Sequence, residues 1–251
     1  MNTTALDISI LGPAFVAGLL VLATHVPLGI QVLSRGIVFI DLAIAQVAGI
    51  GVIAADAVGW EPQGWAVQIA AVTAALAGAL LLTYTEKKWP DVQEALIGVL
   101  FVLASCAGIL LLANNPHGGE HLKDLLVGQI LWVNSRQLTA VAALTLVLLA
   151  IWFLFAPRLG RMGFYAVFAF AVTASVQLVG VYLVFASLII PALATRAVAG
   201  LRRRQVLAYA MGLTAYALGL AISALADLPS GAVVVMTMAL LGVICAALVR
   251  A

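Results

Sequence analysis

The chain has 251 residues, of which 65% are hydrophobic and only 9% are charged, and its mean hydropathy is +1.20. So few charges cannot cover a water-soluble particle of this size, whereas helices that face lipid need no polar cover. The formal net charge of +2 comes from Lys and Arg in the loops and includes no basic patch that would indicate nucleic acid. The apolar runs are continuous, which excludes a porin-like barrel.

Eight apolar stretches follow one another along the chain, and a crossing needs roughly 20 residues. They predict an all-α integral membrane protein, a bundle of 8–9 transmembrane helices, with a single domain over residues 1–251. No Lys or Arg precedes the first stretch, so we expect no cleavable signal peptide. The predicted spans lie near residues 11–33, 36–58, 64–84, 94–113, 137–156, 163–178, 180–198, 205–226 and 229–250.

The sixth and seventh spans come from one apolar stretch, Gly163 to Gly200. It is too long for one crossing at a rise of 1.5 Å per residue, so we divide it near Gly180. Basic residues then follow every odd-numbered span, and cytoplasmic loops are rich in Lys and Arg. This pattern predicts an N-terminus outside and a C-terminus in the cytoplasm. The basic residues are Arg35, Lys87, Lys88, Arg158, Arg161, Arg202, Arg203, Arg204 and Arg250.

Asp41 lies inside the second span, where a charge costs a few kcal/mol and is a functional candidate by default. Its carboxylate could contact a cation or form a structural hydrogen bond, for example to Arg35. Gln46 follows five residues later, about 140° around a helix of 3.6 residues per turn. These two side chains therefore cannot bind one ion from an undistorted helix.

His25 lies in the first span, just before Pro27 and Gly29. These two residues weaken a helix and free backbone carbonyls. A neutral imidazole suits zinc, manganese or iron, and a carboxylate on a neighbouring helix would complete a mixed site. The alternative is a hydrogen bond between helices.

The segment between the fourth and fifth spans is the richest in polar residues. His117, Glu120 and His121 could bind a divalent metal at the outer mouth of the bundle. The alternative is a loop that is polar because it contacts water. Gly118 and Gly119 argue against a regular helix here. Cys106 and Cys245 have no metal-binding spacing, and we interpret them as buried, inert thiols.

Four segments together resemble the permeases of the zinc/manganese/iron ABC transporter family. Val179 to Arg196 is similar to that family's Gly-…-Leu-Leu-Ile-Ile-Pro-Ala run, and Asp227-Leu-Pro-Ser-Gly231 resembles its Asp-x-Pro-x-Gly turn. Glu94-Ala-Leu-Ile-Gly98 resembles an acidic-x-x-Ile-Gly segment, and Asp41 matches the Asp of a Gly-Asp-…-His-Ala segment. The resemblance extends from the first span to the last.

The resemblance implies a permease subunit in a bacterial inner membrane, surrounded by lipid and without catalytic activity or a permanent cofactor. It implies transport of divalent zinc, manganese or iron, with Asp41 contacting the metal. The implied partners are a second permease copy (a homodimer), cytoplasmic ATPase subunits and an extracytoplasmic metal-binding protein.

Two positions depart from the family pattern. The family's His four residues after the Asp is Ala45 here, which leaves His25 or Gln46 as candidates to replace it. The connection from Ala156 to Gly163 is also short, where the family carries the helix that fits into the ATPase. This favours an alternative hypothesis, a carrier or channel that works without an ATPase. A third hypothesis is a membrane hydrolase using His117, Glu120 and His121.

Overall fold

The computed structural model describes residues 7–60, 64–112, 118–155 and 158–250, and the regular structure over these residues is helical. Nine of the α-helices correspond to the nine predicted spans, and α5 is additional. The helices are α1 (Ile8–Arg35), α2 (Ile40–Ala57), α3 (Trp65–Lys88), α4 (Gln93–Leu112), α5 (Gly118–Val127), α6 (Ser135–Phe155), α7 (Gly160–Val179), α8 (Val181–Ala194), α9 (Leu201–Ala226) and α10 (Ser230–Arg250), with short 3-10 helices η2 (Pro90–Val92) and η3 (Ile130–Trp132).

Seven helices in the described ranges are long and apolar enough to cross a membrane: α1, α3, α4, α6, α7, α9 and α10. The helix α2, which carries Asp41 and Asp56, and the short helix α8 pack between them. The prediction of an all-α membrane bundle is therefore confirmed.

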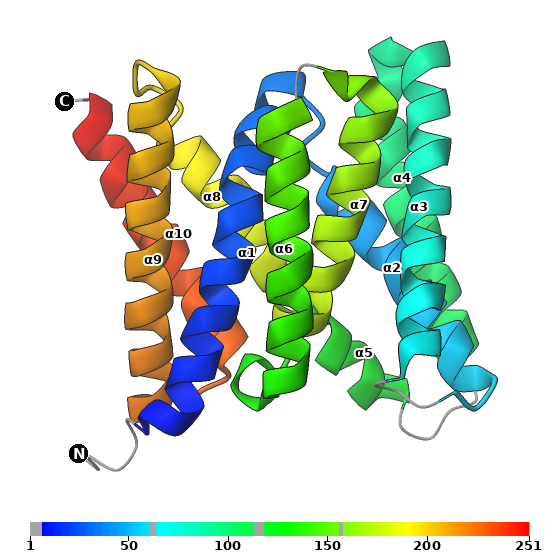
Figure 1. Cartoon of the computed structure of the whole chain (residues 1–251), viewed down its shortest axis with the longest axis horizontal. Helices are drawn as coiled ribbons and strands as arrows, with labels where there is room; N and C mark the ends of the chain where they lie inside the picture. Colours follow the sequence, from blue (N-terminus) through cyan, green and yellow to red (C-terminus); the bar gives the residue numbers. More distant parts are fainter. Residues whose placement is uncertain (1–6, 61–63, 113–117, 156–157, 251) are drawn as a thin grey trace.

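The connections between helices that carry Lys and Arg residues lie at the same end of the bundle. The α1–α2, α3–α4, α6–α7 and α8–α9 connections lie at one end, uppermost in Figure 1, and α10 also ends there. We call this the basic end, because all the Lys and Arg residues predicted to be cytoplasmic belong to these segments. The start of α1, α5 and the α9–α10 connection lie at the opposite end. The predicted grouping is confirmed, whereas the orientation of the termini across the membrane stays a prediction.

The predicted break at Gly180 is present. α7 ends at Val179, α8 begins at Val181, and Gly180 between them has a φ of 82°. A Cβ at Gly180 would overlap the backbone of Val127 and Gly128. Only glycine combines this positive φ with such a close approach of two backbones.

The expectation that Gly118 and Gly119 prevent a helix is wrong, because α5 begins at Gly118. Tertiary contacts override the low helix propensity of glycine here. Leu125 packs against Gly49 of α2, and the carbonyl of Val127 packs against Gly231 of α10. α5 is thus held against the bundle along its second half.

α1 and α7 form the centre of the bundle, since 67% of the membrane window of each is buried. α6 and α10 lie at the periphery, with 11% and 17% of their windows buried. Peripheral helices with apolar surfaces are expected where the solvent is lipid.

The expectation of two buried thiols is wrong for the same reason, because Cys106 is exposed on α4 and Cys245 is half-buried on α10.

The start of α1 lies outside the apolar span and carries a side-chain cap. The Asp7 carboxylate accepts a hydrogen bond of 2.8 Å from the backbone N–H of Ser9. The hydrogen bonds from Ser9 lower the pKa of the Asp7 carboxyl from its usual value. Asp7 therefore stays charged at neutral pH, at the positive end of the helix dipole.

Candidate functional site

Asp41 lies in the first turn of α2 and is only 1% exposed. Neither of its carboxylate oxygens has a hydrogen-bond partner among the described residues. The predicted alternative, a structural hydrogen bond to Arg35, is absent from this part of the chain. The Arg35 guanidinium instead lies 4.1 Å from the centre of the Phe164 ring. A buried carboxylate without a partner is unfavourable unless it neutralises or binds a cation.

The faces of α2 show which helices Asp41 meets. Ile44 and Val47 pack against Gly78 of α3, and Ile53 packs against Gly108 of α4. α2 packs against α3, α4, α7 and α8. Asp41 shares a face with the buried residues Ala45 and Ala48, at spacings of four and seven. This face of α2 is turned away from α4 and lies next to the side that contacts α3. It is therefore directed toward α7 and α8.

Gln46 is also buried, with 7% exposed, but it lies on another face of the same helix. α2 is regular from Ile40 to Ala57, so the predicted separation of about 140° between Asp41 and Gln46 holds. Gln46 is seven residues before Ile53 and therefore faces α4. The structure does not bring Asp41 and Gln46 together.

His25 is fully buried in α1. Its Nδ1 lies 2.9 Å from the carbonyl oxygen of Val21, which can only accept. The Thr24 hydroxyl lies 3.0 Å from the same nitrogen, so which atom donates depends on the tautomer of the ring. Nε2 has no hydrogen-bond partner among the described residues. His25 shares a face with Gly18 and Gly29, which contact α9 and α8.

The structure does not join His25 to Asp41 by a hydrogen bond or an ion pair, since Nε2 and both carboxylate oxygens are unpartnered among the described residues. α1 packs against α6, α7, α8 and α9. α7 and α8 are thus the helices that pack against both α1 and α2.

His117 lies outside the described residues. Glu120 and His121 are in α5, but their side chains are outside the described part of the structure. Among the side chains that are described, no group of three or more His, Cys, Asp or Glu residues could hold a metal ion. The possible metal site at the outer mouth stays a prediction.

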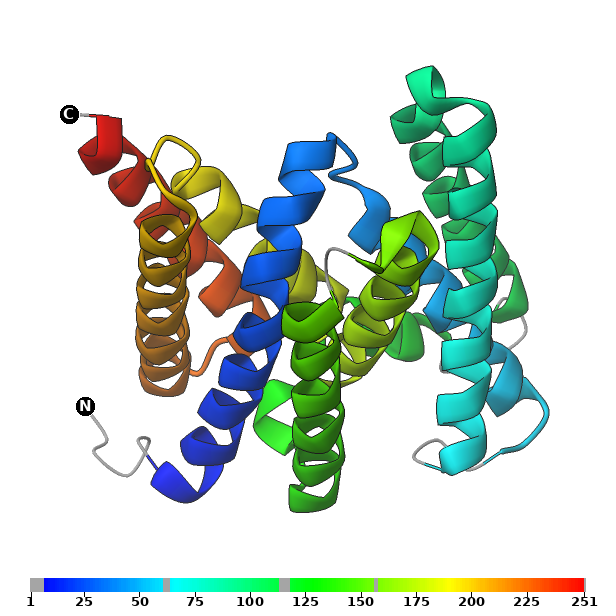
Figure 2. The ribbon, with the colours of Figure 1, turned by 45° about the horizontal axis from the view of Figure 1, so that its top comes forward.

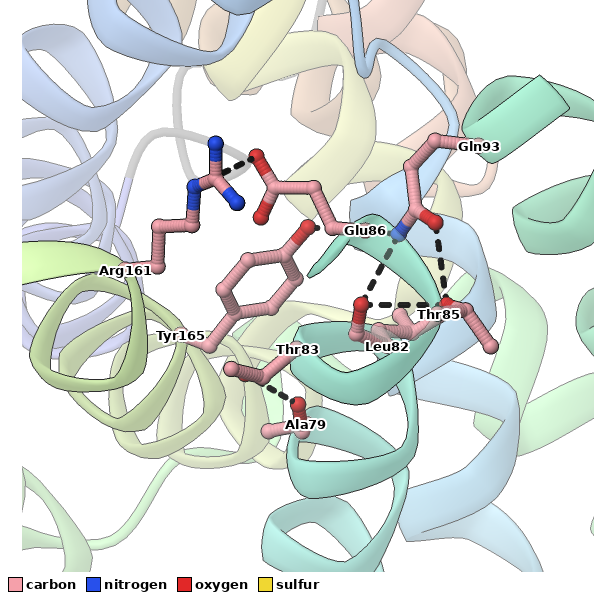
Figure 3. A network of polar contacts seen from close by, with 8 residues as sticks. All are labelled: Ala79, Leu82, Thr83, Thr85, Glu86, Gln93, Arg161 and Tyr165. Atoms are coloured by element: carbon pink, nitrogen blue, oxygen red, sulfur yellow. Dashed lines mark hydrogen bonds and ion pairs between the residues drawn. The ribbon is translucent and has the colours of Figure 1, made fainter. Parts of the chain in front are cut away.

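Sequence reasoning missed a polar network at the basic end, which Figure 3 shows. Gln93, at the start of α4, accepts from the Thr85 hydroxyl at 2.9 Å and donates to the Leu82 carbonyl at 3.0 Å. Its Nε2 also lies 3.4 Å from the Tyr165 hydroxyl of α7. Glu86 forms an ion pair with Arg161, with Nε and Oε1 separated by 3.7 Å. No local pattern predicts this network, because Gln93 and Tyr165 are 72 residues apart.

Glu94 occupies the first turn of α4, as predicted, but it contacts a different helix. Its Oε1 accepts a hydrogen bond of 3.2 Å from the backbone N–H of Phe39, just before α2. Phe39 and Glu94 are 55 residues apart, as are Ile53 and Gly108. α2 and α4 are therefore parallel neighbours in constant register, with Glu94 capping α2.

The chain matches the ABC 3 transport family over residues 7–164 and 155–249. The chain belongs to this family. The resemblance that the sequence motifs carry is therefore confirmed, and the chain is a multi-pass membrane protein of a transport family. In bacteria, such permeases lie in the inner membrane.

The same fold occurs in solved structures of other proteins. The chain matches a chain of PsaBC from Streptococcus pneumoniae in complex with Fab, with a TM-score of 0.78, 22% identity and coverage of 98% of this chain and 95% of the other. It also matches an inward-facing putative metal-chelate type ABC transporter, with a TM-score of 0.67, 18% identity and coverage of 95% and 84%. An uncharacterized membrane protein of Synechocystis, slr2045, is 26% identical over 92% of this chain and 88% of its own length.

The motifs of the family occupy defined places in the fold. The Ile-Ile-Pro-Ala run, 189–192, lies in the buried helix α8. Asp227 has a φ of 54° and ends α9 at the predicted turn, where the Ser223 hydroxyl donates to the Leu228 carbonyl at 2.6 Å. The two matched segments of the family overlap at residues 155–164, which contain the short α6–α7 connection. The two matched segments thus meet at this connection, and the predicted departure from the family pattern there stays a prediction.

Proposed function

We propose that this chain is the permease subunit of an ABC importer for a divalent transition metal, zinc, manganese or iron. Membership of the ABC 3 transport family supports the permease, and the likeness to a putative metal-chelate transporter supports a metal cargo. The proposed partners are cytoplasmic ATPase subunits, an extracytoplasmic metal-binding protein and a second permease copy. The protein would have no catalytic activity of its own.

Asp41 carries the proposal. It is buried in a bundle of membrane helices, and neither of its oxygens has a hydrogen-bond partner among the described residues. Carboxylates in such places usually mark ion pathways. Ala45 occupies the position of the family's histidine and lies on the same buried face of α2 as Asp41. The transported metal would therefore keep Asp41 as its charged ligand and complete its shell with water or backbone oxygens. His25 remains a candidate for a second contact, whereas Gln46 lies on another face of α2.

A second candidate is a carrier that works without an ATPase. The short α6–α7 connection favours it, since only four residues separate Phe155 from Gly160. Family membership favours the importer more strongly, because the match covers nearly the whole chain on both sides of this connection.

The test is metal uptake into proteoliposomes, with zinc, manganese and iron offered separately. We expect uptake only when the ATPase, ATP and the binding protein are present. Uptake by the chain alone would replace the importer with the ATPase-independent carrier.

The Asp41→Asn variant tests the site within the same assay. Asparagine preserves size and removes the charge, so we expect normal assembly and an uptake rate lower by at least about tenfold, the effect of losing about 1.4 kcal/mol. Asp56→Asn, in the last turn of the same helix, is the matched control and should transport normally. Wild-type uptake by Asp41→Asn would remove Asp41 from the pathway.

A further inference from the structure

The α6–α7 connection at the basic end is too short to form a docking helix. α6 ends at Phe155, α7 begins at Gly160, and the backbone N–H of Leu159 already bonds to the carbonyl of Phe155 at 3.0 Å. An ATPase that works with this chain therefore needs another surface at the basic end.

The α3–α4 connection offers such a surface. We call residues 88–92 the η2 turn, because they contain the 3-10 helix Pro90–Val92. Two large apolar side chains of this turn are exposed, Trp89 by 45% and Val92 by 52%. Figure 2 shows the α3–α4 hairpin rising above the neighbouring helices, with this turn at its tip. Tryptophan is enriched among the residues that anchor protein interfaces.

The η2 turn is also rigid. The Lys88 ammonium lies 4.5 Å from the centre of the Trp89 ring, and the Tyr84 and Trp89 rings meet edge to face at 6.3 Å. Directly below, the Thr85–Gln93 and Gln93–Leu82 hydrogen bonds join the end of α3 to the start of α4. A rigid anchor loses little conformational entropy when a partner binds.

The turn is connected to the centre of the bundle. Gln93 contacts Tyr165, and Glu86 pairs with Arg161, so two polar contacts join the α3–α4 hairpin to the first turns of α7 (Figure 3). α7 in turn packs against α1, α2, α3, α6 and α8. A displacement of the η2 turn would therefore reach the helices that surround Asp41.

We propose that the η2 turn is the surface on which the cytoplasmic ATPase docks. The proposal rests on the proposed importer function and names the contact that replaces the absent docking helix. The partner surface is an apolar pocket for Trp89 and Val92, with acidic groups facing Lys87 and Lys88. The Glu86–Arg161 and Gln93–Tyr165 contacts then transmit the movement of the ATPase to α7.

A lipid interface is the other possible occupant, because Trp and Lys are both enriched there. Lipid contact alone does not account for the polar contacts behind the turn. Glu86 is only 16% exposed and Gln93 is buried, and both are directed toward α7.

Photo-crosslinking in the membranes of the host cell distinguishes an ATPase from lipid as the neighbour of the η2 turn. A photoreactive amino acid replaces Trp89, Leu159 of the α6–α7 connection or Trp132 in separate full-length variants. Trp132 is the matched control, since it is 82% exposed in a 3-10 helix at the opposite end. Mass spectrometry identifies the crosslinked protein. Labelling with a photoreactive ATP analogue shows whether that protein binds a nucleotide.

We expect the probe at position 89 to crosslink a nucleotide-binding protein and the probe at 132 not to do so. Crosslinking of that protein from 159 but not from 89 would overturn the docking proposal and leave the importer intact. Lipid adducts alone at 89 would also overturn it. The absence of a nucleotide-binding protein at all positions would contradict the ATPase coupling itself, which the uptake assay tests separately.

The connection to α7 has its own test in the reconstituted complex. In Arg161→Gln we expect the ATPase to remain bound and to hydrolyse ATP, while the metal transported per ATP falls several-fold. Arg158→Gln, at an exposed arginine of the α6–α7 connection just before α7, is the control and should behave as wild type. The charge exchange Glu86→Arg with Arg161→Glu should restore part of the coupling. Normal coupling in Arg161→Gln would show that the ion pair only stabilises the fold.

Discussion

Asp41 and His25 are both buried in the bundle, but their surroundings differ. Nδ1 of His25 has two polar neighbours, the Val21 carbonyl and the Thr24 hydroxyl, and an imidazole can be buried in its neutral form. Asp41 has no such partner among the described residues. An unpaired buried charge costs far more free energy than an unpaired imidazole nitrogen. Asp41 is therefore the residue whose placement needs a functional reason.

At the same scale, Gly29 determines how closely α1 and α8 pack. A Cβ at Gly29 would overlap the carbonyl oxygen of Leu188. We expect Gly29→Ala to lower the free energy of unfolding by about 1–3 kcal/mol, the usual cost of overpacking. Thermal denaturation in detergent measures this change.

Gly98→Ala is the matched control, because a Cβ at Gly98 would have no neighbour within 4 Å. Alanine is favoured over glycine within a helix by roughly 0.5–1 kcal/mol. Gly98→Ala should therefore leave the melting temperature unchanged or raise it. Equal destabilisation by both variants would contradict the close packing of α1 on α8.

At the scale of an element, α1 shows how the bundle accommodates a proline in a buried helix. Pro27 has no N–H, so the carbonyl of Ala23 loses its partner four residues later. The Tyr209 hydroxyl of α9 donates to this carbonyl at 3.0 Å. The sequence predicted that Pro27 frees a carbonyl. It could not show that a side chain 186 residues away satisfies it.

The Tyr209→Phe variant tests this contact. Phenylalanine leaves the Ala23 carbonyl buried without a donor, so we expect a loss of about 1–2 kcal/mol of stability. In a Pro27→Ala background the helix supplies its own N–H, and the loss should be smaller. A double-mutant cycle measures the difference, and equal losses in both backgrounds would contradict the assignment.

The elements that the sequence predicted correctly are the ones whose cause is local. Eight apolar stretches form nine helices, because Gly180 divides the longest of them. α5 was missed because its glycines weaken any local helix signal, and its contacts with Gly49 and Gly231 come from distant segments. The parallel register of α2 and α4 could not be predicted from the sequence either. Asp41 was predictable because a charge in an apolar stretch is itself a local signal, whereas the Gln93–Tyr165 contact is not.

At the scale of the whole molecule, the basic end collects the turns that follow alternate crossings (Figure 1). The distribution of Lys and Arg predicts that this end faces the cytoplasm. The η2 turn would then be accessible to a cytoplasmic partner, and η3 would face the outside.

Cysteine labelling in intact cells tests this orientation. Cys106 and Cys245 are first replaced by Ala, and a single cysteine is introduced at Lys88 or at Trp132. A membrane-impermeant maleimide should label position 132 from outside and position 88 only after permeabilisation. The reverse pattern would invert the topology and place the η2 turn out of reach of any ATPase.

The opposite placement of the start of α1 and the end of α10 (Figure 1) has a practical consequence for protein engineering. Two copies joined head to tail by a soluble linker cannot both insert in the same direction, because the linker would begin and end on different sides of the bilayer. A tandem fusion with two parallel permease units needs an additional transmembrane helix between them, and a split reporter on the two termini should stay dark.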